Sequence, residues 1–169
     1  MKLKLAEKND LNNLKATYKE IIENMNKSNI DIWDEIYPCE FFKNDIENKS
    51  LYVLNEGDDI VAAFALSKSN DGENHVKWEN AKEKAIYIDR LGVNVNYLRQ
   101  GIGGIIIKNA IEIAKAQNIK YLRLFVVDVN KPAINLYLKN GFKQVDGIYE
   151  EKFDDFVLCE YGFEMEILR

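Results

Sequence analysis

The sequence predicts an α/β domain built on a mixed sheet, and three features of the chain point to that fold class. Segments with helical apolar spacing follow strand-like apolar runs along the 169 residues. Neither an internal repeat nor a Pro- or Gly-rich linker separates them, and the chain is long enough to bury a core. We therefore expect a single domain over residues 1–169, with the element order β-α-α-β-β-β-α-β-α-β-β.

The N-terminal part of the chain is expected to begin with a strand and continue with helices. Residues 2–6 alternate polar and apolar side chains, as a short strand does. Apolar positions then recur at helical spacing over residues 11–25, and Asn9 or Asp10 is placed to cap that helix. Because Pro38 breaks the segment that follows, we expect a short helix before it and a second helix over residues 40–48.

The middle of the chain is expected to form three strands and a long helix. Residues 51–55 and 60–67 are apolar runs joined by a turn signal, which predicts two strands. Residues 68–84 are polar and loop-like, whereas the apolar run 86–93 predicts a largely buried strand. Apolar positions over residues 102–118 trace one stripe of a helix.

The C-terminal part is expected to complete the sheet. The apolar run 121–127 is typical of a strand in the interior of a sheet. A helix is predicted over residues 131–139, with Asn130 as its cap. Residues 143–151 and 157–168 are expected to close the sheet as an antiparallel pair.

Composition favours a cytoplasmic protein without a nucleic-acid, membrane or metal partner. The net charge is −5, and no cluster of basic residues marks a face for phosphates. The apolar runs are far shorter than the roughly 20 residues that span a bilayer, and no signal-peptide core is found. Cys39 and Cys159 form no metal-binding motif, so we expect free thiols. The abundance of Lys, Asn and Ile suggests an A+T-rich bacterial genome.

A glycine-rich loop, YLRQGIGG over residues 97–104, joins the predicted strand 86–93 to the helix that follows. Successive backbone N–H groups in such a loop, with the positive end of the helix dipole behind them, form an anion site. Glycine also allows a ligand to approach the backbone closely. The spacing does not match a Rossmann fingerprint, and the G-K-[ST] of a Walker loop is absent. Dinucleotide redox chemistry and NTP hydrolysis are therefore excluded.

Two motifs give the chain a family resemblance. The segment LGVNVNYLRQGIGG, residues 91–104, resembles the acyl-CoA-binding motif of the GNAT superfamily of N-acetyltransferases. The segment VDVNKPAINLYLKNGF, residues 127–142, resembles the second signature of that family, with Asn130, Ala133 and Tyr137 in register. The resemblance implies the family's fold, in which the mixed sheet is mostly antiparallel, and acetyl-CoA as the co-substrate without a metal.

The resemblance assigns three groups of residues to cofactor binding. The end of strand 86–93 is expected to pair with the pantetheine arm, and backbone amides of the loop are expected to cradle the pyrophosphate. The second motif is expected to contact the pantetheine and the thioester. The residues so assigned are Leu91, Gly92, Val93, Leu98, Arg99, Gln100, Gly101, Ile102, Gly103, Gly104, Asn130, Ala133 and Tyr137.

The first motif departs from the family pattern at three positions. Val95 stands where the family often has Pro, Leu98 where it often has Gln or Arg, and Arg99 where it usually has Gly. Since the cradle uses main-chain N–H groups, we expect these changes to tune cofactor affinity rather than abolish it. Arg99 could itself add a charge-assisted bond to a phosphate.

The resemblance implies acetyl transfer to a primary amine by direct attack in a ternary complex. Because a primary amine has a pKa of about 10, a base must take a proton from it. We assign that role to Asp89, with Glu35 and Glu79 as alternatives. Tyr137 matches the residue near the thioester sulfur and is expected to protonate the leaving thiolate. A backbone N–H near Val93 would stabilise the oxyanion.

The acceptor is expected to be a small-molecule amine or a peptide N-terminus. Trp33, Tyr37 and Trp78 could line an amine pocket through cation–π contacts, or pack in the core as large aromatic residues. A non-catalytic acyl-CoA-binding module and an interaction protein of the same fold are the alternatives to an enzyme. A homodimer is compatible with the sequence.

Overall fold

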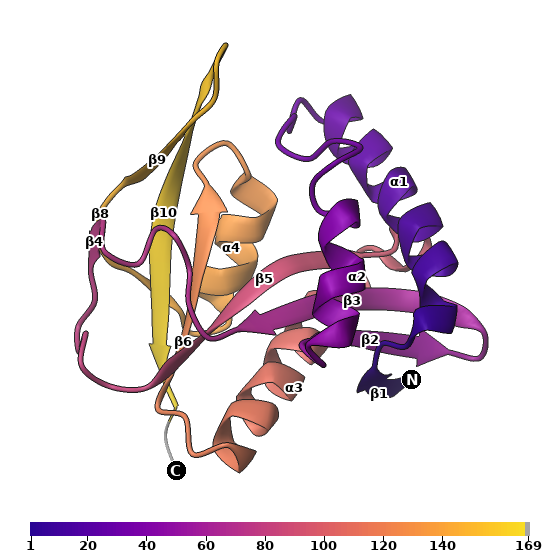
Figure 1. The fold of residues 1–169 in the computed structure, drawn as a ribbon, viewed down its shortest axis with the longest axis horizontal. Coiled ribbons are helices and arrows are strands. Elements are labelled where there is room, and N and C mark those ends of the chain that lie inside the picture. The colour runs from indigo at the N-terminus through magenta and orange to yellow at the C-terminus, as the bar shows by residue number, and fades with distance from the viewer. Residues whose placement is uncertain (168–169) are drawn as a thin grey trace. The chain divides into compact units, whose positions relative to one another are not determined.

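The computed structural model describes residues 1–167, which form two compact units (Figure 1). Unit 1 consists of Met1–Leu66 and Arg90–Ile106, and unit 2 consists of Ser67–Asp89 and the chain from Ile107 onward. The expectation of a single domain over residues 1–169 stays a prediction.

Two elements contribute residues to both units. They are strand β5 (Ala85–Val93), which ends in unit 1, and helix α3 (Ile102–Ala116), which begins there. The described residues form four α-helices and a mixed, mostly antiparallel sheet. The predicted fold class is therefore confirmed.

Unit 1 contains three antiparallel strands that pair in sequence order. β1 (Lys2–Leu5) pairs with β2 (Leu51–Glu56), and β2 pairs with β3 (Asp59–Ser67). In the turn between β2 and β3, Gly57 has a φ of 60°, a left-handed conformation that glycine adopts without steric strain. The two strands predicted around this turn are confirmed.

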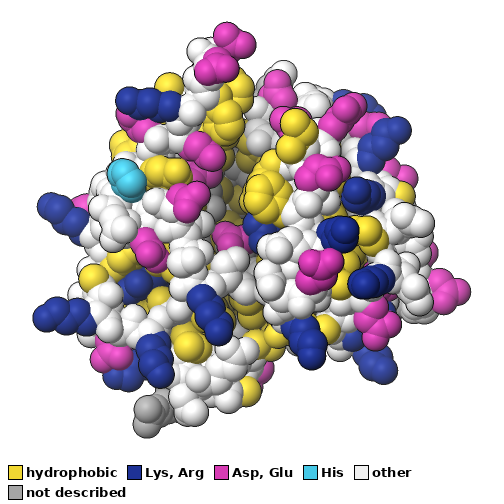
Figure 2. Space-filling model, viewed as in Figure 1, with side chains coloured by type: hydrophobic (Ala, Val, Ile, Leu, Met, Phe, Trp, Pro, Cys, Tyr) yellow, Lys and Arg dark blue, Asp and Glu magenta, His cyan; other side chains and the backbone are white. Residues whose placement is uncertain are grey.

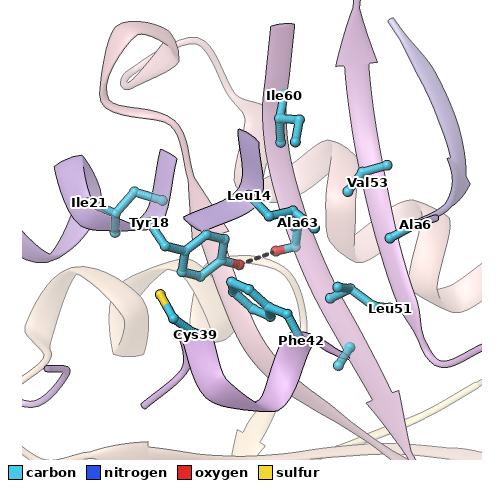
Figure 3. Close-up of a cluster of buried hydrophobic side chains, with 11 residues drawn as sticks. Ala6, Leu14, Tyr18, Ile21, Cys39, Phe42, Leu51, Val53, Ile60 and Ala63 are labelled. Carbon is cyan, nitrogen blue, oxygen red and sulfur yellow. Dashed lines mark hydrogen bonds between the residues drawn. The ribbon is translucent and has the colours of Figure 1, made fainter. Parts of the chain in front are cut away.

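Helices α1 (Leu11–Lys27) and α2 (Phe42–Glu47) cover one face of β2 and β3 (Figure 1). Their apolar side chains form a common core with the strands, which Figure 3 shows around Tyr18. The buried members of this core are Ala6, Leu14, Tyr18, Ile21, Cys39, Phe42, Leu51, Val53, Ile60, Ala63 and Ala65. Because burial of one large apolar side chain contributes about 1.5–3 kcal/mol, this core holds both helices on the sheet.

The short helix expected before Pro38 is not formed, and the chain turns there instead. Asp34 Oδ1 accepts the backbone N–H groups of Ile36 at 2.8 Å and Tyr37 at 2.9 Å. A side chain that binds these amides competes with helical hydrogen bonding, which explains the error. The second predicted helix is present as a 3₁₀ turn, Cys39–Phe41, followed by α2.

Of the two predicted caps, Asn9 lies within the 3₁₀ turn Lys8–Asp10, and Asp10 directly precedes α1 without a side-chain capping bond. Its Oδ2 accepts the backbone N–H of Glu7 at 2.8 Å and lies 2.9 Å from the Nζ of Lys4. The carboxylate therefore stabilises the 3₁₀ turn Lys8–Asp10 and connects it to β1.

Unit 2 contains the remaining strands of the main sheet. β5 runs parallel to β6 (Tyr121–Val127) over Ala85–Tyr87, and β6 pairs antiparallel with β10 (Val157–Glu166). Burial along β6 confirms the predicted interior strand. Residue 168, the last of the predicted strand 157–168, lies outside the described residues.

The strand predicted over residues 143–151 is divided into three short strands. Two of them pair with β10, and the one between them pairs with a strand of the 68–84 segment, which was expected to be a loop. These strands are β7 (Lys143–Gln144), β8 (Asp146–Gly147), β9 (Tyr149–Lys152) and β4 (Val76–Lys77).

Gly147 explains why this part of the chain leaves β10. Its φ is 106°, and a Cβ at this position would lie 2.7 Å from the carbonyl oxygen of His75. Only glycine permits so close an approach between β8 and β4. The antiparallel pairing expected with β10 is therefore present but interrupted.

Helix α4 (Lys131–Lys139) begins at Asn130, whose side chain accepts the backbone N–H of Ala133 at 3.3 Å. The predicted helix and its cap are thus confirmed. Gly141 follows the helix with a φ of 93°, as a helix-ending glycine does.

Helix α3 follows the glycine-rich loop, and its buried side chains lie on one stripe. Asn118 has a φ of 55°, which ends the helical course near the residue expected from the sequence. Within residues 1–167, no helix has the length and apolar character needed to cross a membrane.

Candidate functional site

The glycine-rich loop of unit 1 presents a run of unbonded backbone N–H groups. Within the described chain, the backbone N–H groups of residues 98–104 donate no hydrogen bond. Residues 98–101 are exposed, and α3 begins at Ile102, so the positive end of its dipole lies next to these donors. The loop therefore offers the donors that a phosphate group requires.

Asn94 holds the start of this loop on β3. Its side-chain Nδ2 donates to the carbonyl oxygen of Ile60 at 2.8 Å, and its backbone N–H donates to that of Val61 at 2.9 Å. Its Oδ1 accepts the backbone N–H of Asn96 at 3.0 Å. Because Asn94 is buried and uses all three groups, the loop leaves the strand from a fixed point.

Two residues of the loop have left-handed backbone conformations. Gly101 has a φ of 75°, and a Cβ there would meet no atom within 4 Å, so the conformation and not crowding favours glycine. Arg99 has a φ of 62°, at the position where the family motif usually has Gly. This conformation costs a residue with a Cβ about 1–2 kcal/mol. The replacement of the usual Gly by Arg99 therefore strains the backbone, an effect that the charge of the side chain did not indicate.

The strand end assigned to the pantetheine arm is supported by Tyr18 of α1. The Tyr18 hydroxyl lies 2.5 Å from the carbonyl oxygen of Arg90 on β5 and 3.1 Å from that of Ala63 on β3. Figure 3 shows the second of these bonds. A Cβ at Gly92 would lie 2.8 Å from the Tyr18 ring. Tyr18 thus contacts the residues on both sides of Leu91, and Gly92 is required for that packing.

The side chain of Arg90 also has a fixed position. Its φ is 54°, and its guanidinium forms two hydrogen bonds of 2.8 Å to the carboxylate of Asp45 in α2. Both side chains are buried, at 10% and 7% exposure, so this is a desolvated bidentate pair. It fixes the left-handed residue that immediately precedes Leu91.

In unit 2, the second motif is placed at the start of α4. Asn130 caps the helix, so its side-chain oxygen already has a partner in Ala133. Tyr137 is 7% exposed, and its ring centroid lies 5.6 Å from that of Phe142 and 6.5 Å from that of Phe163. The ring is therefore a core residue, and the catalytic role of its hydroxyl stays a prediction.

Asp89, the predicted base, lies on β5 within unit 2. Its Oδ1 accepts a hydrogen bond from Asn70 Nδ2 at 3.4 Å. Asp89 also acts electrostatically on Glu160 of β10, which the sequence analysis did not single out. The alternatives Glu35 and Glu79 are both exposed.

Glu160 of β10 has a strongly perturbed carboxyl group. Burial, followed by repulsion from Glu151 and Asp89, raises the pKa of Glu160 to about 7. Burial and the nearby Asp71 also raise the pKa of Glu151. In the sequence, Glu160 is visible only as a glutamate within a predicted strand. The acidic residues near it are brought there by strand pairing, which the sequence does not reveal.

The aromatic residues assigned to the acceptor have different surroundings in the two units. In unit 1, the Trp33 ring stacks near Tyr18 at 5.7 Å and meets the Tyr37 ring at 6.4 Å. Tyr37 in turn contacts Phe41, whose ring lies 5.5 Å from the guanidinium of Arg90. Trp33 and Tyr37 therefore belong to one aromatic cluster, and their role in amine binding stays a prediction.

In unit 2, the Trp78 ring forms a cation–π contact with another side chain of the protein. The guanidinium of Arg123 lies 4.5 Å from the ring centroid, and Trp78 Nε1 donates to the carbonyl oxygen of Glu73 at 2.9 Å. Arg123 also forms a buried 2.8 Å ion pair with Glu164. The cation–π property predicted for Trp78 is thus realised with Arg123, and its contact with an acceptor stays a prediction.

The other predicted groups have simple environments. Both cysteines are free, and burial raises the pKa of the Cys39 thiol. Among the described residues, no group of three or more His, Cys, Asp and Glu side chains is arranged to hold a metal ion. Figure 2 shows Lys and Arg interspersed with Asp and Glu over the visible face, without a basic stripe there.

Comparison with known proteins identifies the family. A sequence model of the Acetyltransferase (GNAT) family matches residues 15–142, and the chain belongs to this family. Its curated relatives are named as acetyltransferases, which makes this chain an N-acetyltransferase by class. The family match includes both the glycine-rich loop and the motif around Tyr137.

Three similar proteins illustrate the relationship. A Bacillus subtilis (strain 168) protein with the provisional name phosphinothricin acetyltransferase YwnH is 28% identical over 145 residues, which cover 85% of each chain. An N-alpha-acetyltransferase from Sulfurisphaera tokodaii is 30% identical over 113 residues, 66% of this chain and 68% of the relative. The solved structure of Arabidopsis thaliana NAA60 in complex with acetyl-CoA has a TM-score of 0.70 at 19% identity, covering 98% of this chain and 99% of that one.

Proposed function

We propose that this chain transfers the acetyl group of acetyl-CoA to a primary amine by direct attack in a ternary complex. The observation that carries the proposal is the run of unbonded backbone N–H groups over residues 98–104. In a member of this family, these donors suit the pyrophosphate of coenzyme A. The family match extends over residues of both units, which supports treating residues 1–169 as one catalytic domain.

The proposed cofactor contacts follow the two motifs. Backbone groups of Leu91–Val93 would pair with the pantetheine arm, and the loop amides would bind the pyrophosphate. Asn130, Ala133 and Tyr137 would contact the pantetheine and the thioester. The guanidinium of Arg99 is exposed and is available for an additional phosphate contact.

The proposed reaction requires three groups. A carboxylate base removes a proton from the ammonium form of the acceptor, and the neutral amine then attacks the thioester carbonyl. A backbone N–H near Val93 stabilises the oxyanion. As the C–S bond breaks, the Tyr137 hydroxyl gives a proton to the leaving thiolate.

The proposed acceptor is a small-molecule amine or a peptide N-terminus. Relatives are named for phosphinothricin acetylation and for N-alpha-acetylation, so the family match supports either class. Trp33 and Tyr37 are the candidates for contact with the acceptor in unit 1, since their rings form one cluster.

Binding and turnover test the proposal separately. Calorimetry should detect acetyl-CoA binding, and a thiol-release assay over a panel of polyamines, amino acids, amino sugars and peptides should identify an acceptor. Absence of acetyl-CoA binding would contradict the proposal. Binding without thiol release from any amine would instead indicate a non-catalytic acyl-CoA-binding module.

The role of Tyr137 has its own test. Tyr137→Phe keeps the ring that packs on Phe142 but removes the proton donor, so we expect kcat to fall roughly 100-fold while acetyl-CoA affinity stays nearly unchanged. Tyr121→Phe is the matched control, because Tyr121 is also buried but begins β6, whereas the motif follows its end. A parallel loss of turnover and affinity in Tyr137→Phe would show that the residue is structural.

A further inference from the structure

We infer that Glu160 is the base of the acetyl transfer, with Asp89 and Glu151 as charged neighbours that make it an effective proton acceptor. This assignment rests on the proposed function and replaces Asp89 as the group that takes the proton. The position of Glu160 on β10 and the charges around it support the assignment, as does its lack of a bonding partner within residues 1–167.

Glu160 lies beside the strand that leads into the second motif. In the pairing of β10 with β6, Glu160 is opposite Val127, the last residue of β6. The backbone N–H of Asp128 donates to the carbonyl oxygen of Cys159 at 2.9 Å, so this end of β6 is fixed to β10. Asn130 follows three residues after Val127 and begins the helix that carries Tyr137. Glu160 is therefore attached to the part of unit 2 that bears the proposed acid.

Among the described residues, the Glu160 carboxyl group has no hydrogen-bond or ion-pair partner, unlike a second glutamate on the same face of β10. Side chains alternate along a strand, so Glu160 and Glu164 point to the same face of the sheet. Glu164 binds Arg123 at 2.8 Å and accepts the backbone N–H of Glu79 at 2.9 Å. Within residues 1–167, Glu160 has neither a hydrogen bond nor an ion pair, although it is half-buried. Its carboxylate is therefore free to accept a proton from a ligand.

The charged groups that act on Glu160 come from β9, which pairs with β10, and from β5, which lies beyond β6 in the sheet. Asp89 lies on β5 and Glu151 on β9, and Asp71 of the 68–84 segment acts on Glu151. β6 contributes the uncharged Val127 opposite Glu160. Burial and the two carboxylates raise the pKa of Glu160 to about 7, so both protonation states are populated near neutrality, as an efficient general base requires.

Asp89 is the weaker candidate for the same role because its carboxylate already accepts a hydrogen bond from Asn70. A carboxylate that is held by a donor serves better as a fixed negative charge than as a proton acceptor. Asp89 then has two effects, since it raises the proton affinity of Glu160 and attracts a cationic amine.

The protons balance in this scheme. The acceptor arrives as an ammonium ion and gives one proton to the Glu160 carboxylate, which later releases it to solvent. The neutral nitrogen forms the N–C bond, and the C–S bond breaks as the intermediate collapses. The second proton leaves the nitrogen for the Tyr137 oxygen as Tyr137 protonates the thiolate, which restores the hydroxyl group.

The pH dependence of kcat/KM tests the assignment with acetyl-CoA and an amine that the wild-type enzyme consumes. The wild-type profile should rise through pH of about 7, where Glu160 loses its proton. Glu160→Gln should lower kcat roughly 100-fold or more and abolish that rise, while acetyl-CoA binding by calorimetry stays unchanged. Circular dichroism of the variant should match the wild type.

A second variant checks the electrostatic part without removing the base. Glu151→Gln removes one of the negative neighbours, so the rise should move to lower pH but should not disappear as it does in Glu160→Gln. Glu150→Gln is the matched control, since Glu150 is exposed and opposite Cys159, on the other face of the sheet. It should leave the profile in place.

Each other outcome overturns the assignment. If Glu160→Gln keeps the rise, or if Glu151→Gln leaves it where it was, another group is the base. If the wild-type protein binds no acetyl-CoA or releases no thiol, the proposed function itself fails, and a catalytic role for Glu160 fails with it.

Discussion

Arg99 has a backbone conformation that a glycine would adopt more easily. Its φ is 62°, its side chain is exposed, and it occupies a loop whose amide groups are proposed to bind phosphate. A residue with a Cβ in this region is strained by about 1–2 kcal/mol, which the rest of the fold must offset. In the proposed complex, the exposed guanidinium would add a charge-assisted hydrogen bond to a phosphate, a gain in cofactor binding set against this strain.

Replacing Arg99 separates these two effects. Arg99→Gly should raise the free energy of unfolding by about 1 kcal/mol, because the strain disappears. It should also weaken acetyl-CoA binding several-fold, because the guanidinium is lost. Denaturant unfolding and calorimetry measure the two quantities. Arg99→Ala keeps the Cβ and should weaken binding without a gain in stability, so equal stability gains in both variants would refute the strain argument.

Trp78 shows which property of a residue can be predicted from the sequence and which cannot. An aromatic ring in a protein predicted to bind amines is a reasonable candidate for a cation–π contact. The ring does have a cationic neighbour, but it is Arg123, 4.5 Å from the centroid. Arg123 is 45 residues away in the sequence, on β6, so the contact depends on how the segment that carries Trp78 folds against the sheet.

At the scale of elements, the end of β5 is shaped by helices that precede it in the sequence. Tyr18 of α1 bonds the Arg90 carbonyl oxygen, and Asp45 of α2 binds the Arg90 side chain. Gly92 packs directly against the Tyr18 ring. Residues 90–93 therefore take their geometry from α1 and α2, which adds a supporting role that the motif in the sequence did not indicate.

Tyr18→Phe tests this support. Removing the hydroxyl leaves the buried Ala63 and part-buried Arg90 carbonyl oxygens without this donor, so the free energy of unfolding should fall by about 1–3 kcal/mol. If the support positions Leu91–Val93 for the pantetheine arm, acetyl-CoA affinity should also fall several-fold, as measured by calorimetry well below the unfolding temperature. Tyr52→Phe, on β2, is the control and should leave affinity unchanged. If Tyr18→Phe lowers the free energy of unfolding but leaves acetyl-CoA affinity unchanged, Tyr18 has a structural role only.

Local patterns predicted most elements, and two particular cases show where they fail. Strand-like alternation and helical spacing identified the helices and the long strands, because these depend on which face is buried. The segment 143–151 was expected to form one strand, yet it divides because Gly147 allows β8 to approach β4. The helix expected before Pro38 is absent because the Asp34 side chain binds the amides it would need. Both failures arise from contacts that spacing does not encode.

At the scale of the whole molecule, the candidate site divides into a part that the sequence could reveal and a part that it could not. The loop amides and the Asn130–Tyr137 motif are local in sequence, so their spacing was enough to locate them. Glu160 is different, because its environment depends on Asp89 and Glu151 from two other strands. A sequence shows a glutamate in a strand but not whether a cation neutralises it, as Arg123 does for Glu164.

The same carboxyl groups predict how the stability of the protein depends on pH. The pKa of Glu160 is about 7 in the folded chain and about 4.3 for an unperturbed glutamate, so protonation favours folding. That contribution is complete below the unfolded value and is lost as pH rises through 7. Glu151 adds to it in the same direction, because its pKa is also raised.

We therefore expect the free energy of unfolding to fall between pH 5 and pH 8, by roughly 2 kcal/mol from Glu160 after allowance for its partial exposure. Glu160→Gln carries no charge at any pH, so its stability should change less over this range and exceed that of the wild type at pH 8. Urea unfolding at several pH values measures both curves. A wild-type stability that rises from pH 5 to pH 8 would contradict the argument. The Glu160 carboxylate would then destabilise the fold at neutral pH. A general base must be ionised in order to accept a proton, so this cost in stability accompanies the proposed catalytic role.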